Sequence, residues 1–276
     1  MTGVDPRVTL AKPGLAAQAL EGVIAAERYA ASTALRLTAN SAGLHRAADL
    51  ASERMDELVH GELFEGVGVV GDSVWGQARR DGYVGYVRRE SLALAGAAPT
   101  HWVRAIRTFA FIEPSIKSRA AGPFSLNALV RVEAEEGGFG HADSGMWFWM
   151  AHLAPIGVFE RDPAGVAERF LGAPYLWGGR TSLGLDCSGL VQQALYACGR
   201  ACPRDTDQQA ELGRAIGRPD LARGDLVCWD GHIGMMLDGA RLLHANAHHM
   251  AVTIEPVDEA ISRIEPRAGP TKFRRL

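Results

Sequence analysis

A cysteine in the last third of the chain has the surroundings of a nucleophile. Cys187 follows Asp186, and the apolar residues after it recur at a spacing of about 3.6, which predicts a buried helix that begins at Cys187 and is capped by Asp186. Small buried cysteines usually serve only to pack, but the glycines and the serine around this one indicate a site of close approach. Free backbone N–H groups and the dipole at a helix start favour thiolate. We therefore predict an ionised, nucleophilic Cys187.

A nucleophilic cysteine requires a base, and the base requires a partner that orients it. Two histidines downstream are placed to supply both. His232 opens a predicted strand over 232–237. After an Asp-Gly turn, His244 lies in a second predicted strand over 241–245, so the two strands form a hairpin.

The register of this hairpin decides whether the two histidines can cooperate, because a slip of one residue turns every side chain to the other face. If Met236 pairs with Ala240, the histidines lie directly opposite each other. If Leu237 pairs with Arg241, they are diagonal neighbours on one face. If Leu237 pairs with Ala240, they face opposite ways. The chemistry requires a bulged three-residue turn.

A metal site is the competing interpretation of the same region. Cys198 and Cys202 have a spacing found in zinc pairs, and His248 or His249 could complete the set. A second cysteine pair is lacking, however, and Cys198 fits the apolar face of the predicted helix. We expect no metal and no cofactor.

Length and composition bound the possible classes of protein. The chain has 276 residues, 47% of them hydrophobic, and a formal net charge of -3, so it is long enough for two or three soluble domains. No block of Lys and Arg stands out, so we expect no nucleic-acid partner, and no apolar run of about 18 residues predicts a membrane span. Four cysteines are no disulfide framework, and the N-terminus lacks the pattern of a secretory signal. We therefore expect a reduced, cytoplasmic compartment.

Changes in local composition and in the pattern of apolar residues along the chain predict four segments. Residues 1–40 are an Ala-rich N-terminal arm that suits either a helix or an extended chain. Residues 41–95 and 96–155 share short apolar runs, Gly-containing breaks, an aromatic-rich strand and a closing Leu, which predicts two copies of one small β-barrel, with one irregular β-domain as the alternative. Residues 156–276 read as an α+β domain that opens with a helix over 163–171.

The motifs around Cys187 and the histidines resemble the catalytic domain of the NlpC/P60 family of cell-wall cysteine peptidases. Several motifs of that domain occur in the same order over residues 174–245. The matching pieces are Tyr175-Leu-Trp-Gly-Gly179, Asp186-Cys-Ser-Gly189, Pro203-Arg-Asp-Thr206 with Gln209, Gly224-Asp-Leu226, His232-Ile-Gly234 and Leu243-His-Ala245. Upstream, the two barrel segments are similar to bacterial SH3-like domains, most specifically at Asp81-Gly-Tyr-Val-Gly-Tyr-Val87.

This resemblance implies a multidomain α+β fold, in which two small SH3-like β-barrels precede a papain-like NlpC/P60 catalytic domain. There a helix that carries Cys187 packs on an antiparallel sheet that carries both histidines. The resemblance implies Cys187 as nucleophile, His232 as general base and His244 as the third residue, which holds the imidazole. It also implies cleavage of the bond after γ-linked D-glutamate in peptidoglycan stem peptides.

The layout further resembles members that act on small muropeptides with a free N-terminal L-Ala, in which the first SH3-like domain lines the site. The resemblance implies that Asp186, Ser188, Tyr83 and, by a looser match, Glu62 hold the amino end of the substrate, with Glu65 as a rival to Glu62. A carboxylate that faces an ammonium group makes a strong charged hydrogen bond. The alternatives are barrel packing for Tyr83 and a solvated turn for Glu62.

Tyr175 and Asp205 complete the predicted substrate-binding set, and we expect Arg204 to pin a loop by an ion pair. The predicted function is a cysteine endopeptidase that cuts the γ-D-glutamyl–diamino acid bond of such peptides in cell-wall recycling. Two alternatives stay open: a catalytically silent cell-wall-binding module, and a papain-like amidase that acts on intact peptidoglycan. Either diaminopimelate or lysine fits the position after D-Glu.

Overall fold

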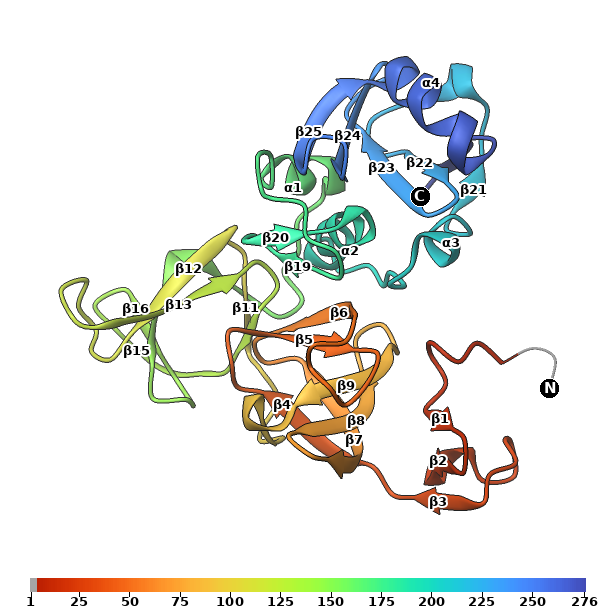
Figure 1. Cartoon of the computed structure of the whole chain (residues 1–276). Coiled ribbons are helices and arrows are strands. Elements are labelled where there is room, and N and C mark those ends of the chain that lie inside the picture. Colours follow the sequence, from red (N-terminus) through yellow and green to blue (C-terminus); the bar gives the residue numbers. More distant parts are fainter. Residues whose placement is uncertain (1–3) are drawn as a thin grey trace. The chain divides into compact units, whose positions relative to one another are not determined.

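The computed structural model describes residues 4–276, and the chain divides into two compact units with the boundary between Ile156 and Gly157. Over the residues described, the regular elements of the first unit are strands and three short 3-10 helices, and the second unit combines helices with a six-stranded and a two-stranded antiparallel sheet (Figure 1). Among the described residues, no helix has the length and apolar character that a membrane span requires.

The N-terminal segment is neither a helix nor a simple extended arm. It forms a small sheet in which β1 (Ala11–Lys12) and β2 (Leu15–Ala17) are antiparallel, while β2 and β3 (Arg28–Ala30) are parallel. Leu15 and Ala17 pack in one buried cluster with Trp75. These tertiary contacts outweigh the helix propensity of the alanines, which is a weak preference.

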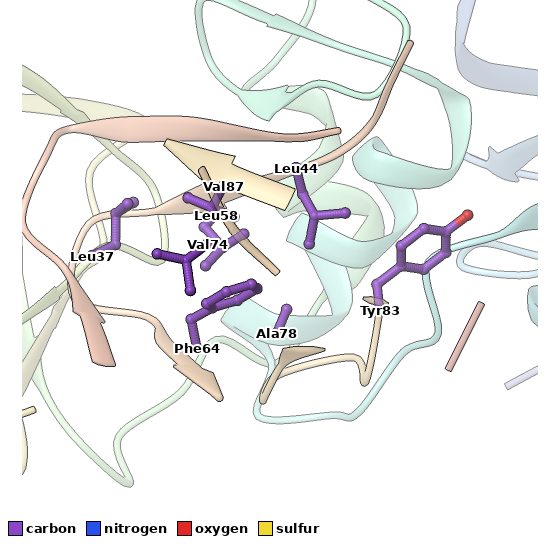
Figure 2. Close-up of a cluster of buried hydrophobic side chains, with 8 residues drawn as sticks. All are labelled: Leu37, Leu44, Leu58, Phe64, Val74, Ala78, Tyr83 and Val87. Atoms are coloured by element: carbon purple, nitrogen blue, oxygen red, sulfur yellow. The ribbon is translucent and has the colours of Figure 1, made fainter. Parts of the chain in front are cut away.

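The first β-domain is a seven-stranded sheet with the order β10-β4-β7-β8-β9-β5-β6. Its strands are β4 (Thr33–Leu37), β5 (Ser41–His45), β6 (Arg54–Val59), β7 (Leu63–Val70), β8 (Ser73–Ala78), β9 (Val84–Arg88) and β10 (Leu92–Leu94). The sheet therefore starts before residue 41, within the segment that we expected to be an arm. Figure 2 shows its core around Phe64, with Tyr83 at the edge of the cluster.

The second β-domain has two sheets, with the orders β14-β11-β18 and β13-β12-β17-β16-β15. Its strands are β11 (His101–Val103), β12 (Arg107–Phe111), β13 (Ala120–Ser125), β14 (Leu129–Val130), β15 (Val132–Glu136), β16 (Phe139–Ala142), β17 (Trp147–Trp149) and β18 (Leu153–Pro155). Phe124 and Phe148 meet edge to face in its core, with ring centroids 5.0 Å apart.

The second unit places one long buried helix beside a six-stranded antiparallel sheet with the order β21-β26-β22-β23-β24-β25. Its helices are α1 (Pro163–Glu168), α2 (Cys187–Ala197), α3 (Thr206–Gln209) and α4 (Val257–Ala268). Its strands are β19 (Arg180–Thr181), β20 (Gly184–Leu185), β21 (Arg214–Ala215), β22 (Leu226–Trp229), β23 (His232–Met236), β24 (Arg241–Asn246), β25 (Ala251–Pro256) and β26 (Lys272–Arg275). The predicted helix over 163–171 ends earlier, at Glu168.

The contacts of this unit explain how its functional residues are held. Every residue of α2 is buried, and the helix packs along β23 and β24. On the sheet, Trp229, Met236 and Leu242 pack against Val257 and Ala260 of α4. Because side chains alternate along a strand, the even-numbered residues of β23 and β24 share this face with α4.

Candidate active site

The predicted helix start at Cys187 is confirmed, and its cap is tightly bound. The Asp186 carboxylate accepts a hydrogen bond from the Gly189 N–H at 2.7 Å and another from the Gly178 N–H at 2.8 Å. A Cβ atom on Gly189 would lie 2.3 Å from the Gly179 carbonyl oxygen, so only glycine allows this close approach. Asp186 and the two glycine contacts thus fix the first turn of α2, which carries the sulfur.

A buried arginine holds the same cap from the other side. Arg204 is only 2% exposed, and its guanidinium donates to both oxygens of Asp186, at 3.0 and 2.5 Å, and to the Ser188 hydroxyl at 2.6 Å. Gln209 donates to the Ser188 carbonyl at 3.0 Å and to the Pro203 carbonyl at 2.8 Å. The loop before α3 is therefore bound to Asp186 and Ser188, the two residues that flank Cys187. Arg204 thus pins this loop by an ion pair, as we expected.

The hairpin adopts the second of the three registers, in which Leu237 pairs with Arg241. Met236 lies opposite Leu242, and the Leu237 N–H donates to the Arg241 carbonyl at 2.8 Å. The two histidines are therefore diagonal neighbours on one face. Nε2 of His232 lies 2.8 Å from Nδ1 of His244, which is a hydrogen bond between the two rings.

The cysteine lies beside the start of β23. The backbone N–H groups of Ile233 and Ser188 donate hydrogen bonds to the Cys187 sulfur, so the sulfur contacts the residue next to His232. The Trp229 indole stacks on the His232 ring with centroids 5.6 Å apart and an interplanar angle of 27°. The structure thus brings together the three residues that we predicted to be catalytic.

Two charged residues extend the histidine pair, and the sequence analysis missed both. Nε2 of His244 lies 2.5 Å from Oε1 of Glu255, and the Arg263 guanidinium of α4 donates to both Glu255 oxygens, at 2.8 and 2.5 Å. His244 is fully buried. Neither residue belongs to a motif, and β25, which carries Glu255, was not among the predicted strands.

Burial disfavours the charged forms of both the Cys187 thiol and the His232 imidazole. The pKa of the Cys187 thiol is raised to about 12, first by burial and then by the Asp186 carboxylate. Burial, followed by the nearby His244, lowers the pKa of His232 to about 3. A helix start contributes about 0.3–1 kcal/mol toward the thiolate, which corresponds to less than about one pKa unit. Full burial can shift a pKa by up to about 3–5 units, so its effect is the larger of the two. Burial thus opposes the ionised resting thiol that we predicted.

We expect iodoacetamide to alkylate Cys187 slowly at neutral pH. Because the thiol pKa is raised, the thiolate fraction at pH 7 is small and increases about tenfold per pH unit, so the rate should rise about 100-fold between pH 7 and pH 9. Mass spectrometry of the peptide that contains Cys187 measures this rate apart from the other cysteines. A rate at pH 6 equal to that at pH 9 would contradict a neutral pair and indicate a resting thiolate.

The comparisons with known proteins identify both parts of this arrangement. Residues 172–265 match the NlpC/P60 family model, and residues 44–92 match the bacterial dipeptidyl-peptidase SH3 domain. The second unit thus contains an NlpC/P60 domain. Within the described residues, no group of three or more His, Cys, Asp or Glu side chains is arranged to hold a metal ion.

Two relatives are each 35% identical to this chain over about 100 residues. The chain is 35% identical to the gamma-D-glutamyl-L-lysine dipeptidyl-peptidase of Bacillus subtilis (strain 168) over 100 residues, which is 33% of this chain and 34% of that relative. It is 35% identical to the probable endopeptidase NlpC homolog of Haemophilus influenzae over 99 residues, or 35% of this chain and 54% of that relative. The chain thus spans about a third of the length of the dipeptidyl-peptidase.

A solved structure supports the fold beyond the NlpC/P60 domain. The NlpC/P60 family protein from Bacillus cereus ATCC 10987 superposes with a TM-score of 0.77 and 19% identity, over 88% of this chain and 99% of that one. An NlpC/P60 endopeptidase from Photobacterium damselae subsp. piscicida gives a TM-score of 0.61 and 13% identity, over 88% of this chain and 73% of that one. The predicted order of N-terminal β-domains followed by an NlpC/P60 domain is confirmed.

Two predicted substrate residues belong to the NlpC/P60 domain and lie in different surroundings. The side chain of Tyr175 is half-buried, and its hydroxyl pKa is raised by burial and then by Coulombic interaction with Cys187 and Asp186. That dependence places Tyr175 beside the cysteine. Asp205 directly precedes α3 and makes no side-chain cap there.

Three further candidates for substrate binding, Glu62, Glu65 and Tyr83, belong to the first β-domain. The carboxylate of Glu62 accepts from the Val59 N–H at 3.1 Å and from Arg80 at 3.0 Å, and the residue is 2% exposed. Glu62 is therefore no solvated turn residue. Tyr83 lies in the buried cluster of this domain but at its margin, with the hydroxyl directed away from Ala78 (Figure 2). Glu65 forms an ion pair with Arg79.

Proposed function

We propose that this chain is a cysteine peptidase that hydrolyses the bond between γ-linked D-glutamate and the following diamino acid in peptidoglycan stem peptides. The observation that carries the proposal is the hydrogen bond of 2.8 Å between His232 and His244, next to a cysteine at the start of α2. A base with its own orienting partner beside a nucleophile is the arrangement that acyl transfer requires. NlpC/P60 membership and a relative named gamma-D-glutamyl-L-lysine dipeptidyl-peptidase support it.

The chemistry follows from a resting pair that is neutral. His232 takes the proton of Cys187 as the sulfur attacks the γ-D-glutamyl carbonyl carbon, so the ionised thiol exists only along the reaction path. A backbone N–H at the start of α2 stabilises the oxyanion. The imidazolium of His232 then protonates the leaving amine, and water hydrolyses the thioester with His232 again as the base.

The substrate in this proposal is a small muropeptide with a free N-terminal L-Ala, processed in cytoplasmic cell-wall recycling. Tyr175, Ser188 and Asp205 of the NlpC/P60 domain bind it. Asp186 contributes chiefly by holding the helix start, because its two oxygens already accept hydrogen bonds from Gly178, Gly189 and Arg204. The SH3 match at residues 44–92 supports a role for the first β-domain.

Cleavage of four peptides tests the proposal. We expect L-Ala-γ-D-Glu-L-Lys, its meso-diaminopimelate counterpart, or both, to be cleaved after D-Glu, and their N-acetylated forms to be cleaved at least about 100-fold more slowly, because a lost charged hydrogen bond costs ~1.5–3 kcal/mol and a buried group left unpaired costs more. Liquid chromatography of the released diamino acid measures both rates. Equal cleavage of free and acetylated peptides would favour an enzyme of intact peptidoglycan, and no cleavage of any peptide would favour the binding module.

A further inference from the structure

A line of three side chains crosses three neighbouring strands of the sheet. His232 on β23, His244 on β24 and Glu255 on β25 are each displaced by one diagonal step, because His244 lies opposite Thr253 and Glu255 lies opposite Leu242. Diagonal neighbours on one face of an antiparallel sheet are within reach of long side chains. The line ends at Arg263 of α4, which covers this face.

The ion pair at the end of the line fixes where the protons of His244 lie. Glu255 accepts two hydrogen bonds from Arg263, so its carboxylate is ionised and can only accept. The contact of 2.5 Å between Glu255 and Nε2 of His244 therefore requires a proton on Nε2. His244 is fully buried, which disfavours a second proton on the ring, so its Nδ1 is left as an acceptor.

The same reasoning determines which nitrogen of the His232 ring carries the proton. A contact of 2.8 Å between two ring nitrogens holds one proton. Because Nδ1 of His244 accepts, Nε2 of His232 must donate. Nδ1 of His232 then carries a free lone pair, which is the state that a base needs.

We propose that Glu255, held by Arg263, is a positioning residue that sets both histidines in the Nε2–H tautomer and so leaves Nδ1 of His232 to accept the Cys187 proton. This inference rests on the proposed function for its kinetic consequence, but the tautomers are a property of the free protein. When His232 becomes an imidazolium, the same line places the negative charge of Glu255 two hydrogen bonds away. Without Glu255, nothing holds the proton of His244 on Nε2, and Nδ1 of His244 no longer has to accept from His232.

Two substitutions of Glu255 distinguish its effect on the histidine tautomers from the effect of its negative charge. Glu255→Ala removes the acceptor, and we expect kcat to fall on the order of 100-fold with KM about unchanged, as supporting hydrogen bonds of this kind typically cost ~10–100-fold. In Glu255→Gln the amide oxygen can occupy the Oε1 position and accept from both His244 and Arg263, so kcat should fall by only about tenfold. The matched control is Glu259→Gln on α4, an exposed carboxylate, which should leave kcat within about twofold of wild type.

Nitrogen-15 NMR of the histidine rings gives a readout that needs no turnover. In the wild type, both His232 and His244 should show the neutral Nε2–H pattern, and in Glu255→Ala the His244 signals should move toward a mixture of tautomers. An Nδ1–H pattern at either ring of the wild type would overturn the inference, as would a Glu255→Ala variant with kcat within about twofold of wild type. If the wild type cleaves no peptide, the proposed function fails, while the ring spectra still decide the tautomers. If Glu255→Ala does not fold, the wild-type spectra decide.

Discussion

Replacement of Cys187 by alanine should abolish peptide hydrolysis, with a loss of at least about 10⁴-fold in kcat. His232→Ala should cost nearly as much, and the double variant little more than either, because residues that act as one unit are not additive. Release of the diamino acid from L-Ala-γ-D-Glu-diamino acid peptides is the measurement.

A cysteine at the other end of the same helix provides the control for this experiment. Cys198→Ala changes the same residue type at the C-cap of α2 and should retain activity within about twofold of wild type. Full activity of Cys187→Ala would remove the peptidase assignment and leave the cell-wall-binding module as the function to test.

Removal of the buried arginine should cause the largest loss of stability among single substitutions at the site. Arg204→Met leaves the Asp186 carboxylate without its charged partner, and breaking a buried pair in this way typically costs about 3–5 kcal/mol of the free energy of unfolding. We expect the lower part of that range, because the N–H groups of Gly178 and Gly189 still donate to Asp186. Urea unfolding of the full chain is the measurement.

The cysteines allow the unfolding of the relevant unit to be followed alone. All four free thiols, Cys187, Cys198, Cys202 and Cys228, lie after Gly157, so their labelling by a thiol reagent in urea reports only on the second unit. Arg218→Met is the matched control, since its pair with Asp258 is exposed and exposed pairs contribute about 0–1 kcal/mol. Equal destabilisation by the two substitutions would mean that the Arg204 pair does not hold the site together.

The parts of the site that local sequence rules govern could be predicted. The spacing after Cys187 and the cap at Asp186 gave the start of α2, and the Asp-Gly turn gave the hairpin of His232 and His244. Both features depend on residues close together in the chain. The choice among registers needed the structure, because the three-residue turn at Asp238 is held by its side chain, which accepts from the N–H groups of Ala240 and Arg241.

Features that depend on distant partners could not be predicted. The pKa of Cys187 is raised first by burial, which a sequence pattern does not measure and which opposes the effect of the helix dipole. The Ala-rich segment near the N-terminus forms strands because Leu15 and Ala17 pack against Trp75, which is distant in the sequence. Glu255 escaped notice because its role arises only when β25 pairs with β24.

The three-residue turn between β23 and β24 has a consequence for how this family can vary. As long as the present strand pairing beside the turn is kept, loss or gain of one residue between the turn and either histidine would place the rings of His232 and His244 on opposite sides of the sheet, whereas a change of two would return them to the same side. The number of residues between each histidine and the turn should therefore change in even steps wherever the pair is in use. A change by an odd number of residues would indicate a relative that keeps the fold but no longer pairs the two histidines for catalysis.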